Sequence, residues 1–527
     1  MASSGRPVVP VASRRVSGAA AAGAAAGAVG GVLAGLVARV GDADGWRSWS
    51  RQVEHTRYCS RPVRVAGGAD AVHAGTGEVL ASYSTSGEAD GALLLACGDR
   101  RAAVCASCAE TYRRDTWHVI AAGLRGRVPS VPGLDGVPVS VAAHPVLLAT
   151  LTAPSFGAVH RAADGPCRAR AVRRRCPHGG PRWCDARHGD GDAVVGRPLC
   201  VSCYDYTGHV LWHAMLPELW RRTVIYTYRA LARLAGARCG RPVTVREVRG
   251  LLRVSYVKVA EYQRRGAVHL HAVLRLDGVD ADAPNAVVAP PAWADAELLA
   301  EALREAAGRV RVPVPVVGMG ARSARWGAQL DVAPVDDPER AAAYLAKYAT
   351  KTAGDVLSGL PPRRFGRADL PRISRRVNNA HTMLLVAECF WLSRRPELAA
   401  LGLERWPHTL GFRGHFASKS RRYSVTLGTL RGVRRAWRAE RSQRPDGDPW
   451  AAARTAGGSS GGGAAPVVVG GWRYLGTGWA LLGDADLAAA LARDHRAARA
   501  AADLVTVARD GLAGWLAGRA AGSGGGR

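Results

Sequence analysis

The sequence predicts an α+β fold in which an antiparallel sheet with flanking helices is interrupted by zinc-binding insertions. Three observations predict this fold: a strand-turn-strand pattern at 251–276, helical patterns before and after it, and cysteines gathered in two groups. At 527 residues the chain is long enough for several domains and a sizeable hydrophobic core.

Helical and strand patterns precede the hairpin. Residues 33–53 have a helical pattern. The run "HPVLLATLTAPSFG" (144–157) is rich in leucine and β-branched residues and closes with Pro and Gly, which predicts a buried strand and a turn. A second helix is expected over 217–236.

The hairpin itself covers 251–276, with its turn at Gln263 to Gly266. Behind it, the patterns predict a helix at 295–310, a strand at 328–335 and a helix at 337–354. A strand-like run at 470–482 and a helix from Asp484 to about Arg509 complete the chain.

These patterns divide the chain into six predicted regions. They are a disordered Ala/Gly-rich extension (1–32), a Cys-rich region expected to bind zinc (33–143), a domain that contains the hairpin (144–355) with a zinc-binding insertion at about 160–205, a helical accessory region (356–446), a flexible linker (447–466), and a C-terminal strand and helix with a disordered tail (467–527).

The charge of the chain indicates a polyanionic partner. The formal net charge is +29, which favours nucleic acid over a membrane surface. Only four of the 72 basic residues are lysines, and two of these, Lys347 and Lys351, fall in the short stretch "YLAKYATK". This clustering suggests a need for an ammonium group there, because lysine is a compact charge and arginine is not.

The N-terminal segment does not resemble a signal peptide. It lacks a small-residue cleavage site behind a Leu-rich core, and its uncharged run from Val16 to Val37 is mostly Ala and Gly. A membrane anchor is the alternative, but these residues are too weakly apolar to insert. We therefore expect a cytoplasmic protein, in which closely spaced cysteines favour zinc over disulfides.

The cysteines form two candidate zinc groups. The first consists of Cys59, Cys97, Cys105 and Cys108. The second contains Cys167, Cys176, His178, Cys184, His188, Cys200 and Cys203, more ligands than one zinc ion needs; of these, Cys176, Cys184, Cys200 and Cys203 are favoured. Cys239 and Cys389 are expected to be buried apolar residues.

The second hairpin strand carries His269 and His271 on one face, because side chains alternate along a strand. The turn can fold Glu261 back beside them. Two imidazoles and a carboxylate leave open coordination positions, as in a catalytic metal site. The alternatives are solvated strand histidines and an exposed glutamate.

The stretch "YLAKYATK" predicts a helix that presents Tyr344, Tyr348 and Lys351 on one face, with Lys347 beside them. A phenol is a poor nucleophile until its anion is stabilised, and a nearby ammonium together with a metal ion supplies that stabilisation. The alternative is an amphipathic helix whose tyrosines only contact the core.

Three motifs in this order, "VLLATLTAPSFG", "HLHAVL" after "KVAEYQRRG", and "YLAKYATK", resemble those of HUH-family rolling-circle replication initiators. The resemblance is greatest to the Rep proteins of actinomycete plasmids and integrative elements, whose "LCVSCYDY" and "GFRGHFASKSRRYS" segments are similar, and it covers residues 45–510.

The resemblance implies an HUH endonuclease domain in which His269 and His271 bind the catalytic Mg²⁺ or Mn²⁺ ion. It implies that Tyr348 is the nucleophile, helped by Lys347 and Lys351, and that Tyr344 is a second nucleophile. One plasmid branch of this family has Glu at the position of Tyr344, whereas this chain has Tyr there.

The expected activity is therefore origin-specific nicking and strand transfer through a 5′-phosphotyrosine intermediate. The expected DNA partners are the double-strand origin and the displaced single strand. A host helicase and polymerase are expected as well, because the chain has no G-x-x-x-x-G-K-[ST] motif. A single-strand transposase with the same chemistry and a non-enzymatic zinc-dependent DNA-binding regulator are the alternatives.

Overall fold

The computed structural model describes five stretches of the chain: 18–126, 137–315, 322–357, 359–441 and 467–501. The chain divides into two compact units, one formed by its two ends (Met1–Cys97 and Pro445–Arg527) and one by its middle (Gly98–Arg444). The predicted linker at 447–466 lies outside the described residues.

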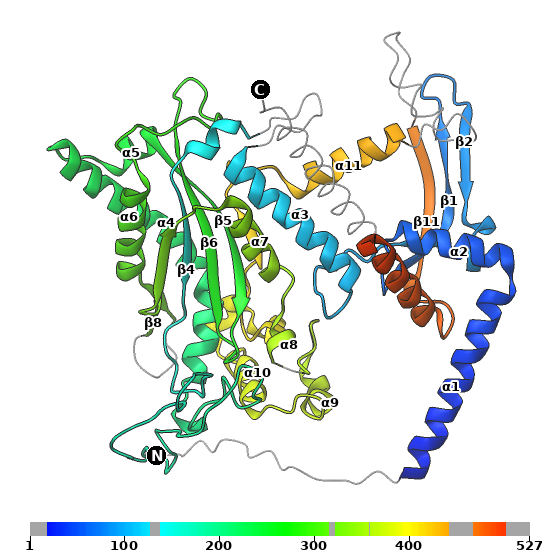
Figure 1. Cartoon of the computed structure of the whole chain (residues 1–527), viewed down its shortest axis with the longest axis horizontal. Coiled ribbons are helices and arrows are strands. Elements are labelled where there is room, and N and C mark those ends of the chain that lie inside the picture. The colour runs from blue at the N-terminus through cyan, green and yellow to red at the C-terminus, as the bar shows by residue number, and fades with distance from the viewer. Residues whose placement is uncertain (1–17, 127–136, 316–321, 358, 442–466, 502–527) are drawn as a thin grey trace, which may run out of the picture. The chain divides into compact units, whose positions relative to one another are not determined.

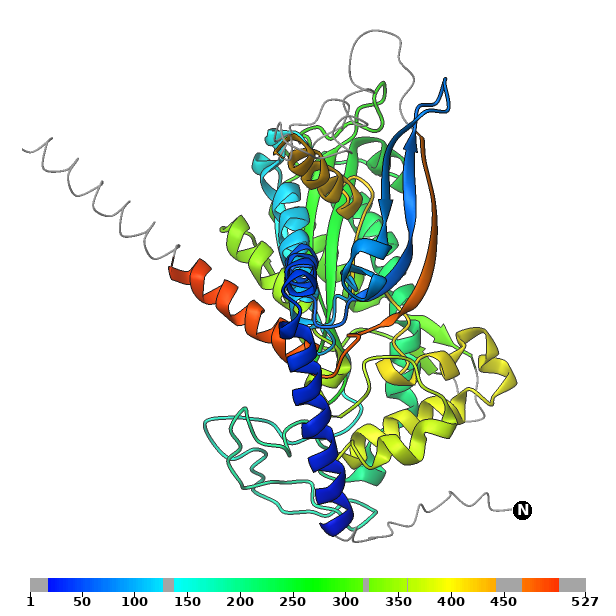
Figure 2. The ribbon, with the colours of Figure 1, turned by 90° about the vertical axis from the view of Figure 1, so that its right-hand side faces the viewer.

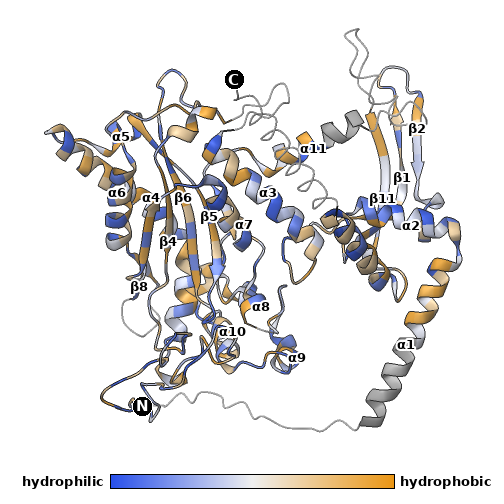
Figure 3. Ribbon diagram, in the orientation of Figure 1, coloured by the Kyte–Doolittle hydropathy of each residue, from blue (hydrophilic) through white to orange (hydrophobic). Residues whose placement is uncertain are grey.

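Two helices open the first unit. Helix α1 (Gly18–Gly41) includes much of the segment predicted to be disordered, so that prediction is wrong from Gly18 on; residues 1–17 lie outside the described part. Asp42 separates α1 from α2 (Ala43–His55) because its side chain caps the second helix. The second half of α1 is hydrophobic (Figure 3), but no helix in the described ranges is long and apolar enough to span a membrane.

The sheet of the first unit combines both ends of the chain. Its central strand β1 (Val63–Val72) pairs antiparallel with β2 (Val79–Ser84), with the short β3 (Leu93–Leu95) and with β11 (Val467–Thr477). The C-terminal strand was therefore predicted correctly, and the helix expected after it is present over 484–501. This helix contributes Ala488 to a core shared with Trp49, Val53 and Leu94.

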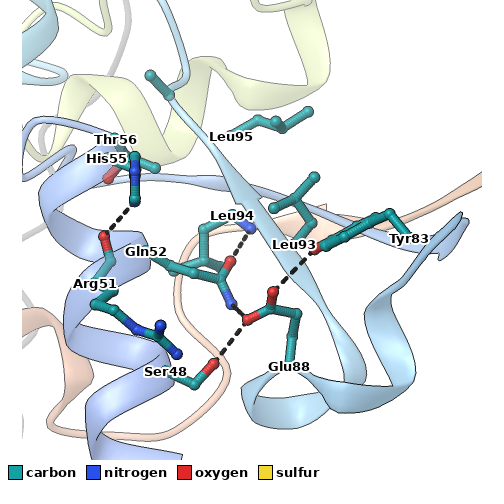
Figure 4. A pocket seen from close by; sticks show the side chains of 11 residues that line it. Ser48, Arg51, Gln52, His55, Thr56, Tyr83, Glu88, Leu93, Leu94 and Leu95 are labelled. Carbon is teal, nitrogen blue, oxygen red and sulfur yellow. Dashed lines mark hydrogen bonds between the residues drawn. The ribbon is translucent and has the colours of Figure 1, made fainter. Parts of the chain in front are cut away.

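A pocket of about 540 Å³ lies beside α2 in the first unit (Figure 4). Glu88 lies at its centre, where its carboxylate accepts hydrogen bonds from Ser48 (2.7 Å), Gln52 (2.9 Å) and Tyr83 (3.1 Å). Gln52 also accepts a hydrogen bond from the backbone N–H of Leu94. The polar lining is therefore used to join α2 to the sheet.

The second unit is built on a five-stranded sheet (Figure 1). All neighbours are antiparallel, in the order β10 (Ala417–Lys419), β5 (Leu252–Tyr262), β6 (Val268–Gly278), β4 (Val146–Leu151) and β9 (Leu330–Pro334). The structure thus confirms a mixed α+β fold with antiparallel sheets.

Strands β5 and β6 form the predicted hairpin, in register from Leu252 opposite Gly278 to Tyr262 opposite Val268. The predicted turn is present: Gly266 donates its N–H to the carbonyl of Gln263. Gly266 has φ 78°, and a Cβ there would lie 2.9 Å from Leu410. Only glycine fits both the dihedral angle and the space.

The two faces of this sheet are covered by different helices (Figure 2). One face packs against α4 (Tyr206–Cys239) and α6 (Ala296–Arg309), and its core includes Leu270. The other face packs against α3 (Ala106–Arg125) and α7 (Pro338–Tyr348), and its core includes Val273. Helix α4 begins earlier than expected because Asp205 caps it, and Pro217 lies inside it.

Further elements surround this sheet. They are α5 (Val245–Leu251), β7 (Val312–Val314), β8 (Arg322–Ala324), α8 (Ala353–Val356), α9 (Leu370–Ser374), α10 (Ala380–Leu392) and α11 (Leu427–Arg441). The predicted accessory region at 356–446 does contain helices, but it also supplies the edge strand β10. It is therefore part of the sheet domain and not an appendage to it.

A buried ionic network joins β6 to its surroundings. The Arg275 side chain, 0% exposed, donates two hydrogen bonds to Asp277 (2.6 and 3.0 Å) and others to the carbonyls of Gly123 and Tyr423. Asp277 also contacts His144 Nδ1 at 2.8 Å. Since a buried charge is tolerated only when it is paired and hydrogen-bonded, these contacts hold α3 against the sheet.

Candidate active site

Strand β6 places His269 and His271 on the face that α7 covers. Their neighbours Val268, Leu270 and Ala272 belong to the core on the opposite face, as the strand periodicity predicted. In the register of the hairpin His269 lies opposite Glu261. The predicted third ligand is thus the cross-strand neighbour of the first.

His271 is held at both ring nitrogens. It is 3% exposed, with Nε2 2.8 Å from a Glu261 carboxylate oxygen and Nδ1 3.1 Å from the Thr150 hydroxyl. Thr150 is its cross-strand neighbour on β4. Partners at both nitrogens fix the orientation of the ring. Sequence reasoning missed Thr150, although it is the hydroxyl residue in the apolar run "VLLATL".

His269 is neutral at physiological pH. Desolvation, followed by the charges of His271 and Arg265, lowers its pKa to about 4, although the Glu261 carboxylate opposes this shift. A neutral imidazole keeps a lone pair that can bind a cation. The rings of the two histidines have centroids 6.4 Å apart. In the described part of the chain, His269, His271 and Glu261 are not among the sets of potential metal ligands whose ligand atoms all lie within 4.8 Å of one another.

Helix α7 brings both tyrosines onto His271. Asp337 caps the helix by accepting a hydrogen bond from the Arg340 N–H, and Pro338 occupies its first turn. Tyr348 stacks on the His271 ring, with centroids 5.0 Å and planes 17° apart. Tyr344 contacts the same ring edge-on at 5.2 Å.

The two lysines lie around Tyr348. Lys351 Nζ is 4.7 Å from the centroid of the Tyr348 ring and 3.5 Å from a Glu261 oxygen; Lys347 Nζ is 5.8 Å from the same ring. One expectation is wrong: α7 ends at Tyr348, so Lys351 is not on the helix. Its N–H donates to the Tyr348 carbonyl in a turn that brings the amine back to the ring.

The two phenols differ in their surroundings. Desolvation, followed by the contact with Tyr348 and the negative charge of Glu261, raises the pKa of Tyr344 above its usual range. The two amines, in contrast, lie against the Tyr348 ring. Tyr344 therefore lies near a negative charge, whereas Tyr348 has two amines near its ring.

Arg100 supports the turn after the tyrosines. Its guanidinium donates hydrogen bonds to the carbonyls of Ala349 (3.0 Å) and Lys351 (3.4 Å) and stacks on Phe416 at 4.0 Å. Sequence reasoning missed this residue, because a single arginine 249 positions before Ala349 carries no local signal for such a contact. Arg100 fixes the backbone that carries Lys351.

Two groups of cysteine and histidine in the second unit have the spacing of metal ligands. His160, Cys167, Cys184 and His188 form one, and Cys176, His178, Cys200 and Cys203 form the other; within each, the ligand atoms all lie within 4.8 Å of one another. Both groups could hold a metal ion such as zinc. The structure therefore places Cys184 apart from the three cysteines with which it was predicted to bind zinc. His178 is the fourth member of their group instead.

The first predicted cysteine group extends over the boundary between the two units. Cys59 and Cys97 belong to the first unit, where the Cys97 N–H points at the Cys59 sulfur (3.3 Å). Cys105 immediately precedes α3 in the second unit and Cys108 lies in its first turn. Of the two single cysteines, Cys389 is buried as expected. Cys239 is exposed, so the prediction that it is buried is wrong.

Comparison with known proteins identifies the class to which this basic chain belongs, that of replication initiators. Residues 45–493 match the family model described as "Replication initiator protein, pSAM2" (RepSA). A curated "Replication initiator protein" from Streptomyces ambofaciens is 42% identical over 415 residues, which is 76% of this chain and 83% of that protein. The chain belongs to the RepSA family of replication initiator proteins. It acts in the initiation of replication, which implies that it binds DNA. No solved structure matches it.

Proposed function

We propose that this initiator starts rolling-circle replication by nicking one strand of a double-strand origin and remaining bound to the 5′ end. The observation that carries the proposal is the convergence of His269, His271, Tyr344 and Tyr348 on one face of the β5–β6 hairpin. Tyrosine nucleophiles beside paired histidines are the parts that an HUH endonuclease requires.

In the proposed reaction the phenol oxygen of Tyr348 attacks the phosphorus at the nick. A Tyr–O–P bond forms and the bond from phosphorus to the 3′ oxygen breaks. The phenol proton passes to solvent, and the released oxygen takes up a proton to become the 3′ hydroxyl primer. Lys351 and Lys347 stabilise the phenolate, because their amines lie against the Tyr348 ring.

The donor set beside the tyrosines suits a divalent cation. The imidazoles of His269 and His271 and the Glu261 carboxylate would hold Mg²⁺ or Mn²⁺ through nitrogen and oxygen atoms. The bound ion would withdraw charge from the phosphodiester. Thr150 fixes the orientation of the His271 ring.

Closure of the strand requires a second transfer. Tyr344 is proposed as the second nucleophile, because it contacts both His271 and Tyr348 and is 37% exposed. A host helicase and polymerase would unwind and copy the duplex. We also propose that Cys59, Cys97, Cys105 and Cys108 bind a structural zinc ion, on the basis of their thiolate chemistry.

The test is to incubate the full chain with a divalent ion and a supercoiled plasmid that carries the double-strand origin. The expected result is relaxed circles with protein attached to the 5′ end of the nick. Tyr348→Phe should produce no adduct, and the matched control Tyr474→Phe, which changes a 64% exposed tyrosine in the first unit, should nick like the wild type. Binding without cutting would instead identify a regulator, and cutting only at the ends of an element would identify a transposase.

A further inference from the structure

The segment between β4 and α4 has almost no apolar core of its own. Over residues 158–203 it forms one short 3-10 helix and isolated bridges, and its buried residues are Cys167, Cys176, Gly196 and Pro198. A segment of this length without regular structure or a core needs another source of stability. Two of its four buried residues are cysteines from the two candidate metal groups.

Three ligand separations in the first group are close to those of a tetrahedral zinc site. With the usual Zn–N and Zn–S bonds, a tetrahedron requires about 3.3 Å between two nitrogens and about 3.5 Å between nitrogen and sulfur. The His160 and His188 nitrogens are 3.2 Å apart, and Cys184 Sγ is 3.4 Å from His188 Nε2. Cys167 Sγ lies 3.8 Å from His160 Nδ1.

A neighbouring carboxylate orients one of these ligands. The Nδ1 atom of His188 is 3.3 Å from Asp192, so Nε2 is the nitrogen that faces Cys184 and His160. This carboxylate–histidine pairing is the arrangement found behind zinc-bound histidines.

In the second group, two ligand separations are close to tetrahedral values. Cys176 and Cys200 have sulfurs 3.5 Å apart, against about 3.8 Å for two thiolates on one zinc ion, and His178 Nδ1 is 3.3 Å from Cys203 Sγ. Gly180 leaves space for the sulfur atoms because it has no side chain. A Cβ at this position would lie 2.9 Å from the Cys200 sulfur. The glycine is therefore required by the thiolates beside it.

The ligand pairs of the two groups alternate along the chain. Their order is His160 and Cys167 for the first, Cys176 and His178 for the second, Cys184 and His188 for the first, Cys200 and Cys203 for the second. No continuous half of the segment can complete either site alone. We propose that the segment 158–203 is a module that binds two zinc ions through interleaved ligand pairs, one with two sulfurs and two nitrogens and the other with three sulfurs and one nitrogen.

The first site supports the hairpin that carries the histidines. The His160 N–H donates a hydrogen bond to the Arg197 carbonyl, and the His160 carbonyl accepts one from the Gly196 N–H, both at 2.8 Å. A Cβ on Gly196 would lie 2.4 Å from the backbone of Arg264 in the hairpin turn. The module thus packs directly against this turn.

The test counts metal ions and needs neither DNA nor nicking, so its result is independent of the proposed function. Native mass spectrometry of the reduced full chain compares the wild type with a variant that carries both Cys167→Ser and Cys200→Ser. The variant is expected to hold two zinc ions fewer. The control Cys239→Ser, an exposed cysteine in neither group, should lose none. A loss of one ion or none from the double variant would overturn the proposal.

A second measurement uses the unmutated chain and so does not depend on how variants fold. After exchange of zinc for ¹¹³Cd, the spectrum should contain one resonance typical of two sulfurs and another typical of three. Only one such resonance, or a disulfide between Cys176 and Cys200 in the freshly purified protein, would contradict two interleaved sites.

Discussion

The ring of Tyr348 stacks on the ring of His271, with the centroids 5.0 Å apart and the planes at 17°. The proposed nucleophile thus lies directly against a proposed metal ligand, with both amines around it. Tyr348→Phe is expected to abolish the covalent adduct and replication. Tyr344→Phe should still nick but should be impaired in the closing transfer. Mass spectrometry of the phosphotyrosyl peptide decides the assignment: an adduct on Tyr344 alone in the wild type would reverse it.

The histidine pair should be needed for cutting and not for binding. Affinity for the origin should come from arginine contacts to phosphates, with a steep salt dependence, so replacing His269 and His271 by Ala should remove nicking and leave origin binding within about threefold. Gel-shift and nicking assays on the same preparations measure both effects. His55→Ala, an exposed histidine in the first unit, is the control. Parallel loss of binding and cutting would indicate a structural role instead.

Arg100 is expected to act as a positioning residue. Arg100→Met keeps an apolar contact with Phe416 but removes the hydrogen bonds to Ala349 and Lys351, whose loss costs on the order of 1.4 kcal/mol, or about tenfold in rate. Nicking should slow by this factor with unchanged origin affinity, and Arg100→Lys should restore part of the rate. Arg114→Met, which removes a surface pair with Glu110, is the control and should change neither. An unaltered nicking rate in Arg100→Met would refute the role.

The ionic network on β6 makes a prediction about stability. Asp277→Asn leaves the Arg275 guanidinium buried without its counter-ion, which should cost about 3–5 kcal/mol of unfolding free energy. Glu301→Gln, which removes a 3.9 Å surface pair with Arg233, should cost under about 1 kcal/mol. Urea unfolding measures both, and similar costs would show that the buried pair is not important for stability.

Buried histidines should make the fold sensitive to acid. Burial lowers the pKa of His213 from 6.5 to about 4, although a hydrogen bond to the Leu410 carbonyl opposes the shift. Below pH 6.5 the unfolded chain binds a proton there that the folded chain does not, so unfolding free energy falls as the pH drops from 6.5 to 4. Between pH 7.5 and 5 the loss from this residue is about 2 kcal/mol. His213→Gln should lose about that much less than the wild type over this range, and equal losses would rule out His213 as the cause.

The sequence predicted the elements whose signals are local. The hairpin followed from alternating residues and a glycine turn, and the helix at 337–354 from its periodic pattern. The end of α7 at Tyr348 was missed, because "ATKT" continues an acceptable helical pattern and the Arg100 contacts that stabilise the turn come from far away in the sequence.

The parts that could not be predicted depend on long-range contacts. The division of ligands between two metal groups depends on which distant pairs meet, and His160 precedes Cys167, the first residue of the predicted second zinc group. The three-residue strand β10 has too few residues for a periodic signal, and its pairing with β5 is set by the fold around it.

The edge position of β10 has a consequence for synthesis of the protein. A ribosome that works from the N-terminus completes the hairpin and α7 well before it reaches Ala417, so during that interval the β5 edge has no neighbour. Tyr423, whose side chain is fully buried against α3, arrives later still. Nascent chains that stop short of this point should therefore expose an unpaired strand next to the tyrosines, and chaperone binding or aggregation should be greatest for chains truncated between α7 and β10.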